Sequence, residues 1–216
     1  MLGSAPCVQK GVLRNLRRGN YAKVVAALTP GSHQLVDWTA PDRYPEIFAA
    51  AAAAAPDARR ILSFGCSTGE ECVSLAQYFP KAEIVGAEIN VLSLLKAMKR
   101  RSDRIRFVYS SDRILSRLGG FDVVFCMAVL RAPKKQQRLG NYPFEVFEER
   151  ALFLESLVRP GGLLVIHNSM YRFSDTAHRG SYERIPVVAK HDKGVFLPDG
   201  VTEVEPDGCL WRKREP

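Results

Sequence analysis

The stretch Ile61-Leu-Ser-Phe-Gly-Cys-Ser-Thr-Gly-Glu-Glu71 decides the fold. Three of its first four residues are apolar, which is typical of a buried parallel strand. A turn bounded by Gly65 and Gly69 follows, and a helical pattern then runs over residues 70–79. Glycine permits backbone angles and close approaches that other residues do not, and a helix start offers N–H groups to a polar ligand. The stretch predicts the first strand, turn and helix of a nucleotide-binding unit.

The next apolar strand ends in an acid. Glu88 closes the run Ile84-Val-Gly-Ala-Glu88 and lies 19 residues after Gly69. In a βαβ nucleotide site, a carboxylate at this place accepts the hydroxyls of a ribose. The dinucleotide fingerprint G-x-G-x-x-G would need glycines at 67 and 70, where this chain has Ser67 and Glu70. The spacing disfavours an NAD-dependent oxidoreductase, which remains an alternative that a ligand screen decides.

Strands and helices alternate from residue 58 onwards. Further strands are predicted at 83–87, 106–109, 121–127 and 163–167, and further helices at 91–101, 113–118 and 145–158. This alternation indicates a parallel sheet with helices on both faces and right-handed crossovers. Near the C-terminus, Pro-Asp-Gly turns separate the short runs 195–197, 201–204 and 209–212, which predicts antiparallel strands there.

Four motifs in order resemble those of the class I S-adenosylmethionine-dependent methyltransferase superfamily. The glycine turn is similar to its motif I, although Ser63 stands where an acid is usual and Ser67 where a glycine is usual. The run Cys66-Ser-Thr-Gly-Glu-Glu71 also resembles the variant found in chemotaxis-receptor methyltransferases. The later motifs match at 110–112, at 121–130 (FDVVFCMAVL) and at 158–166 (VRPGGLLVI). The resemblance covers about residues 58 to 170.

The resemblance implies a doubly wound α/β fold with a mostly parallel seven-stranded sheet and a C-terminal antiparallel hairpin. The runs at 195–197, 201–204 and 209–212 would supply the sixth and seventh strands. Residues 58–216 would form the Rossmann-like methyltransferase domain, and residues 1–57 a helical extension packed on it. Within that extension we expect a helix from Pro45 to the residue before Pro56, lying against the sheet edge and covering the cofactor. Arg43 and Tyr44 at its start either contact a ligand carboxylate or cap the helix.

The implied cofactor is S-adenosylmethionine, with S-adenosylhomocysteine as the product. The resemblance places its binding at the glycine turn and at the ends of the second, third and fourth strands, on Gly65, Cys66, Ser67, Gly69, Glu88, Ile89, Asn90, Ser111, Asp112, Cys126 and Met127.

Candidate catalytic residues follow the fourth and fifth strands. In-line methyl transfer mainly requires alignment of donor and acceptor, and a base is needed only for a hydroxyl or a protonated amine. His167, Tyr171 and Tyr142 are the candidates, and a structural role is the alternative for each. Tyr142 belongs to the polar insert 131–144, which is either part of a substrate mouth or a surface loop.

Composition narrows the class of protein. The chain has 216 residues, of which 46% are hydrophobic and 25% charged, as in an ordinary globular domain. We find no apolar run of the roughly 20 residues that span a membrane and no signal-peptide pattern, so we expect a cytoplasmic protein without membrane association. Five scattered cysteines and the histidines 33, 178 and 191 have no metal-ligand spacing, so no metal is predicted.

The acceptor is expected to be a small molecule. The motif [D/N/S]-P-P-[Y/F/W] of the amino-group methyltransferases of nucleic acids is replaced by Cys126-Met-Ala-Val-Leu130, which resembles small-molecule enzymes. The net charge of +8 keeps nucleic acid possible, and an acidic small substrate fits that charge equally well. A protein side chain as acceptor, and a non-catalytic cofactor-binding scaffold of the same fold, are the remaining alternatives. The oligomeric state is not predicted.

Overall fold

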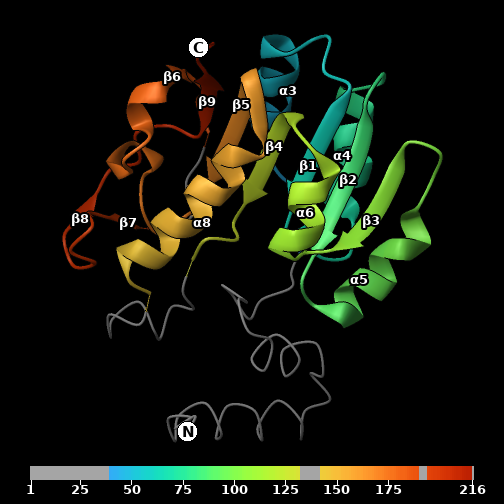
Figure 1. Ribbon diagram of the computed structural model, residues 1–216, viewed down its shortest axis with the longest axis horizontal. Helices are drawn as coiled ribbons and strands as arrows, with labels where there is room; N and C mark the ends of the chain where they lie inside the picture. Colours follow the sequence, from blue (N-terminus) through green and yellow to red (C-terminus); the bar gives the residue numbers. More distant parts are fainter. Residues whose placement is uncertain (1–38, 132–141, 190–193, 216) are drawn as a thin grey trace, which may run out of the picture.

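The computed structural model describes residues 39–131, 142–189 and 194–215 (Figure 1). Their main feature is a seven-stranded sheet with the order β3-β2-β1-β4-β5-β9-β6. Its strands are β1 Arg60–Phe64, β2 Glu83–Glu88, β3 Ile105–Tyr109, β4 Phe121–Met127, β5 Val158–His167, β6 Tyr182–Ile185 and β9 Leu210–Lys213. The α-helices are α3 Pro45–Ala54, α4 Glu70–Tyr78, α5 Val91–Ala97, α6 Asp112–Leu118 and α8 Phe144–Ser156. Short 3₁₀ helices are η1 Met98–Arg100, η2 Phe173–Asp175 and η3 Arg179–Ser181.

The first five strands of the sheet are parallel. β1 pairs with β2 on one side and with β4 on the other, and β3 and β5 extend the sheet outward. β9 is antiparallel to both β5 and β6. The strand order therefore reverses between β1 and β4, and in open α/β sheets ligands bind at the carboxyl ends of the strands beside such a reversal.

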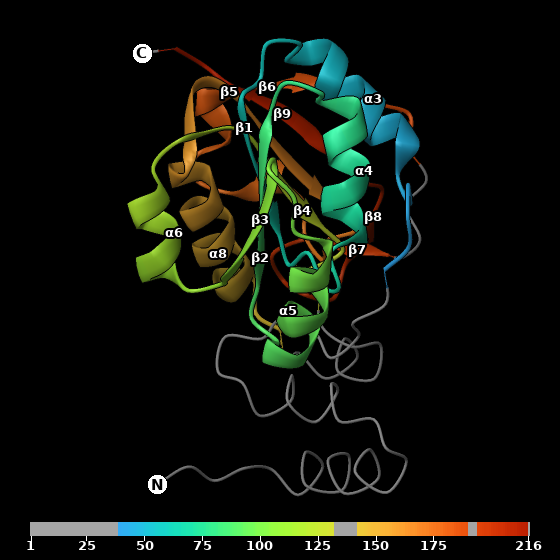
Figure 2. The same ribbon diagram turned by 90° about the vertical axis from the view of Figure 1, so that its right-hand side faces the viewer.

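Helices cover both faces of the sheet (Figure 2). On one face, α3 and α4 pack on the central strands, and the ring of Phe48 in α3 meets the ring of Phe125 in β4 edge to face at 5.7 Å. On the other face lie α6 and α8, and Phe147 of α8 is fully buried in that core. Apolar side chains alternate to the two faces along the buried strands, so each face receives its own core.

The predicted fold class is confirmed, and the boundaries of the first four strands agree closely with the sequence patterns. β5 begins at Val158 rather than at the predicted residue 163, and the helix predicted at 91–101 is α5 followed by the 3₁₀ helix η1. The helix expected after Pro45 is also present. It packs on the face of the sheet rather than at an edge, because Ile47, Phe48 and Ala51 bury one side of it against the central strands. Residues 1–38 of the predicted N-terminal extension lie outside the described residues.

The prediction for the last strands is partly wrong. The runs at 195–197 and 201–204 do form antiparallel strands, β7 Val195–Phe196 and β8 Glu203–Val204, but these make a separate two-stranded sheet. The sixth strand of the main sheet is β6, and β9 is the seventh. β6 is only four residues long and pairs on one side only, and of its residues only Tyr182 is buried. Such a short, polar edge strand has no hydrophobic pattern that reveals it in a sequence.

Candidate active site

The glycine turn links β1 to α4 in a left-handed backbone conformation. Gly65, Ser67 and Gly69 have φ angles of 73°, 50° and 92°. The N–H groups of Gly65 and Cys66 both donate to the carbonyl of Ala87 in β2, at 2.8 and 3.1 Å. A Cβ at position 65 would lie 2.4 Å from Cγ2 of Val129. The turn thus needs glycine at 65 for both its backbone angle and its close approach to the chain after β4.

Glu88 joins the glycine turn to the start of the next helix. Its Oε2 accepts a hydrogen bond from the N–H of Ser67 and its Oε1 one from the N–H of Asn90, both at 2.7 Å. The side-chain oxygen of Asn90 in turn caps α5 by accepting from the N–H of Leu92 at 3.0 Å. The N–H groups of Ser67 and Asn90 fix the orientation of the Glu88 carboxylate at the carboxyl end of β2. Ile89, which lies between Glu88 and Asn90 in the sequence, is half-buried.

The other predicted cofactor residues already have structural contacts. The hydroxyl of Ser111 is the N-cap of α6, accepting from the N–H of Ile114 at 3.4 Å. Asp112 forms an ion pair with Arg150 of α8. Cys126 and Met127 end β4 and are buried, and burial raises the pKa of the Cys126 thiol well above its ordinary value. The role of these four residues in cofactor binding stays a prediction.

Glu71 is the functional candidate that sequence reasoning missed. It lies in the first turn of α4, and its Oε1 accepts a hydrogen bond from the hydroxyl of Ser63, a fully buried residue of β1, at 2.8 Å. Desolvation raises the pKa of the Glu71 carboxyl to about 7, against the opposing effects of the Ser63 hydrogen bond and the charge of Arg43. The one sequence signal was Ser63 itself, at a position where the resembling family usually has an acid.

His167 ends β5 and faces the start of α3. Its ring meets the ring of Tyr44 edge-on, with centroids 4.9 Å apart, and it is almost fully buried. The hydroxyl of Tyr44 accepts a hydrogen bond from Nδ2 of Asn168 at 3.1 Å, and the guanidinium of Arg43 lies 4.8 Å from the centre of the Tyr44 ring. The segment before α3 therefore contacts the carboxyl end of β5, as expected if it covers a ligand site.

Tyr171 and Tyr142 form an aromatic pair inside the core. Their rings stack with centroids 6.3 Å apart, and the hydroxyl of Tyr171 donates to the backbone carbonyl of Tyr142 at 2.6 Å. Desolvation raises the pKa of both phenols above their ordinary value, which disfavours either one as a base. Residues 132–141 of the predicted insert lie outside the described residues.

Arg131, the first residue of that insert, is buried and binds three backbone carbonyls. Its guanidinium donates to the carbonyls of Asn168, Ser169 and Gly194 at 3.3, 2.9 and 2.8 Å, and 2% of the residue is exposed. The sequence places this arginine at the start of a polar loop, and nothing in the pattern predicts its burial.

Residues with a left-handed backbone conformation are concentrated at the carboxyl ends of the strands. Four described non-glycine residues have positive φ, and three of them, Ser67, Ala128 and Asn168, directly follow β1, β4 and β5 or lie in the turn beyond. Such conformations carry a free-energy cost, and they cluster at ligand sites where the surrounding structure holds them. This edge of the sheet is the candidate active site.

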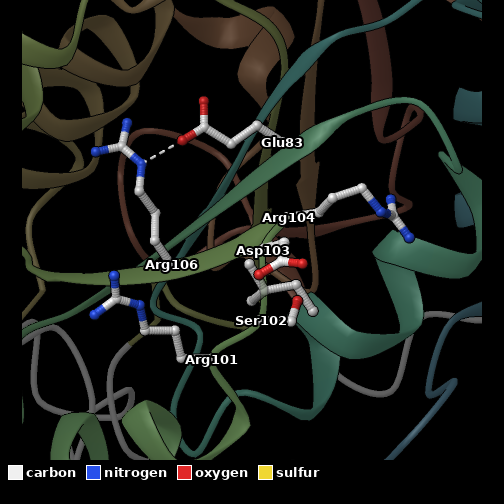
Figure 3. A pocket seen from close by; sticks show the side chains of 7 residues that line it. Glu83, Arg101, Ser102, Asp103, Arg104 and Arg106 are labelled. Carbon is white, nitrogen blue, oxygen red and sulfur yellow. Dashed lines mark ion pairs between the residues drawn. The ribbon is translucent and has the colours of Figure 1, made fainter.

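At the opposite, amino edge lies a pocket of about 420 Å³ lined by Glu83 and residues 101–106 (Figure 3). Arg106 forms an ion pair with Glu83 at 2.6 Å. Arg104 points the other way (Figure 3) and donates to the carbonyls of Ala76 and Phe79 at the end of α4 and of Ala82 just before β2. Arg104 and Arg106 are thus both engaged in contacts within the chain.

In the part of the chain that the structure describes, no three His, Cys, Asp or Glu residues are grouped as metal ligands. His178 contacts Glu155 instead, at 3.3 Å, and His33 and His191 lie outside the described residues. None of the described helices has the length and apolar character needed to cross a membrane.

The trans-aconitate 2-methyltransferase of Deinococcus radiodurans is 31% identical to the chain in an alignment of 135 residues, and the match covers 58% of the chain. The chain spans about half the length of this relative, 47%. Together with the sheet order and its antiparallel β9, this likeness settles the fold. The chain has the fold of the class I methyltransferases.

Solved methyltransferase structures are similar at lower identity. An amino pentose methyltransferase from Micromonospora echinaspora is 24% identical with a TM-score of 0.43, over 56% of this chain and 47% of that one. An O-methyltransferase family protein from Burkholderia thailandensis is 15% identical with a TM-score of 0.48, over 73% and 43% of the two chains. No protein-family model matches the chain.

Proposed function

We propose that the protein is an S-adenosylmethionine-dependent methyltransferase that acts on a small molecule. The observation that carries the proposal is Glu88, held at the carboxyl end of β2 by the N–H groups of Ser67 and Asn90. A fixed carboxylate beside a left-handed glycine turn suits a ribose whose two hydroxyls donate hydrogen bonds. The named activity of the Deinococcus radiodurans relative supports methyl transfer.

The chain would bind and orient the cofactor at the carboxyl edge. Glu88 would accept from the ribose hydroxyls, and the turn Gly65–Gly69 would let the backbone approach the ligand closely. The cofactor itself supplies the electrophilic methyl group on its sulfonium. The protein's task is then to align the acceptor and to exclude water, which suits the buried side chains after β4 and β5.

For a hydroxyl acceptor we propose His167 as the base, because it ends β5 beside the segment that leads into α3. In an assay with an identified acceptor, His167→Ala is expected to lower turnover by about 10²–10⁴-fold while cofactor affinity is retained. Full activity would assign His167 a structural role. A small-molecule acceptor is supported by the named substrate of the Deinococcus radiodurans relative, trans-aconitate.

Calorimetric titration with S-adenosylmethionine, S-adenosylhomocysteine and NAD tests the proposal. We expect micromolar binding of the first two ligands and its loss in Glu88→Ala. The matched control is Glu83→Ala at the other end of β2, where the carboxylate pairs with Arg106 at the surface, and this variant should bind like the wild type. Binding of NAD alone, or equal affinity of the two variants, would contradict the proposal. Binding without turnover on any acceptor would favour the scaffold.

A further inference from the structure

Helix α5 exposes three large apolar side chains and buries small ones. Val91, Leu95 and Met98 are 48%, 55% and 49% exposed, and Met98 opens the η1 turn that continues the helix. Their spacing of four and three residues places them on one face of the helix, which we call the α5 face. The residues that α5 buries are Ser93 and Ala97. A surface helix of a globular protein normally has the opposite arrangement, with its apolar stripe towards the core.

Close packing beneath the helix explains why small residues face inward. A Cβ added at Gly69 would lie 3.2 Å from Cβ of Ala97 and 2.9 Å from Cζ of Phe107 in β3. The inner side of α5 thus packs tightly against the glycine turn and β3, where a larger side chain at position 97 would not fit. The large apolar residues of the helix are therefore left on its outer side.

Cations flank the α5 face. Residues 91–101 contain no Asp or Glu. Their four basic residues, all exposed, are Lys96, Lys99, Arg100 and Arg101. Arg100 pairs with Glu70 of α4, whereas the other three side chains form no ion pair within the part of the chain that the structure describes. Exposed apolar residues that are grouped and rimmed by polar ones mark a docking surface, and these charges require an anionic partner.

We propose that the α5 face binds an anionic lipid surface, a property that does not depend on the proposed methyl transfer. Apolar side chains of such a helix enter the boundary between headgroups and acyl chains, while lysine and arginine beside them reach the lipid phosphates. A helix that lies on a membrane needs no spanning segment, so the lack of a spanning helix among the described residues does not oppose it. In Figures 1 and 2, α5 lies at the periphery of the described part of the molecule.

Charge and polarity argue against other occupants of the α5 face. A second copy of the chain, packed face to face, would bring Lys96 and Lys99 against the same two residues, and like charges in contact repel. Residues 1–38 carry five lysines and arginines and one acid, Asp37, so their charge has the same sign. Nucleic acid matches the charge, but its backbone offers no apolar layer to the three exposed side chains.

Flotation of the full chain with vesicles tests the proposal. We expect binding to phosphatidylcholine vesicles with about 40% phosphatidylglycerol, and at least about tenfold weaker binding to phosphatidylcholine alone. Leu95→Gln combined with Met98→Gln keeps the charge and a good helix propensity but removes apolar contact, so binding should weaken about tenfold. Lys96→Gln combined with Lys99→Gln should weaken it roughly 25-fold, because each cation at the surface contributes about fivefold.

Matched variants elsewhere on the surface are the controls. Val201→Gln alters an apolar residue of the loop between β7 and β8 that is 80% exposed. Arg113→Gln combined with Arg117→Gln removes two exposed cations from α6, on the other face of the sheet. Both controls should bind the anionic vesicles within about twofold of the wild type in about 0.1 M salt, where distant charges are screened.

Three results would overturn the proposal. They are no binding of the wild type to the anionic vesicles, equal losses in the α5 variants and the controls, and a loss in the lysine variant with none in the Leu95 and Met98 variant. The last result would show that the apolar side chains have no part in binding. If vesicles are not bound, binding of single-stranded DNA or of poly-glutamate that is lost in the lysine variant would assign the α5 face to nucleic acid or to an acidic protein instead.

Discussion

Two parts of one sheet edge use their polar groups in opposite ways. At the carboxyl ends of β1 and β2, the β1–β2 edge, Glu88 and Glu71 are acceptors held by N–H and O–H groups of the chain. At the carboxyl ends of β4 and β5, the β4–β5 edge, Arg131 and Tyr171 are donors directed at backbone carbonyls.

The polar groups of the β1–β2 edge are candidates for ligand binding, whereas those of the β4–β5 edge hold the adjoining loops in place. The β1–β2 edge carries carboxylates, which can accept hydrogen bonds from the hydroxyl donors of a ligand, as the proposed function requires. The donors of the β4–β5 edge form hydrogen bonds to backbone carbonyls of the loops that follow the strands. These hydrogen bonds fix the conformation of that edge. We therefore expect substitutions at the two edges to separate affinity from stability.

The largest effect on stability is expected at Arg131. Arg131→Met removes donors from three carbonyls, of Asn168, Ser169 and Gly194, and leaves them buried without those partners. We expect the free energy of unfolding in urea to fall by about 4 kcal/mol. S-adenosylhomocysteine affinity at the β1–β2 edge should change by less than about threefold.

Arg131→Lys is the matched variant, because lysine keeps the positive charge but offers one nitrogen instead of a planar fork. It should lie between the wild type and Arg131→Met in stability. If Arg131→Met were as stable as the wild type, the β4–β5 edge would not depend on the hydrogen bonds of Arg131. The two edges would then not differ in their effect on stability.

A smaller loss of stability, combined with a large loss of affinity, is expected at Gly65. A methyl group there would lie 2.4 Å from Val129, on a backbone with φ of 73°. Gly65→Ala should lower the free energy of unfolding by about 3 kcal/mol, from backbone strain and overpacking together. It should also weaken cofactor binding, because the turn must shift.

Gly119→Ala provides the control for backbone strain alone. Gly119 has φ of 77°, but a methyl group there would come no closer than 3.7 Å to another residue. Because its ψ is −177°, Gly119 lies in a region of backbone angles that is essentially restricted to glycine. About 1–3 kcal/mol of destabilisation with unchanged affinity is expected. If Gly65→Ala and Gly119→Ala changed the free energy of unfolding and the cofactor affinity equally, the close approach of Val129 to the turn would have no effect on either quantity.

The sequence predicts what depends on local pattern. The apolar runs and the glycine turn follow from short-range rules, and the strands β1 to β4 and the backbone angles of the turn agree with them. Glu71 was missed because two adjacent acids at a helix start are usually explained by the helix dipole, and its partner Ser63 is eight residues away. Arg131 was missed because its acceptors lie 37 to 63 residues further along the chain. Burial of a polar residue is set by such distant contacts.

The smallest effect on stability is expected at Tyr171. The same variant tests whether this tyrosine has a structural or a catalytic role. Tyr171→Phe removes only the hydroxyl that donates to the carbonyl of Tyr142 and keeps the stacked ring. We expect the free energy of unfolding to fall by about 1 kcal/mol, with unchanged cofactor affinity, measured by urea unfolding and calorimetry on the same sample. Turnover on an identified acceptor should stay within about threefold of the wild type, because the raised pKa of the phenol opposes a role as a base. A loss of turnover of a hundredfold with full stability would assign Tyr171 a catalytic rather than a structural role.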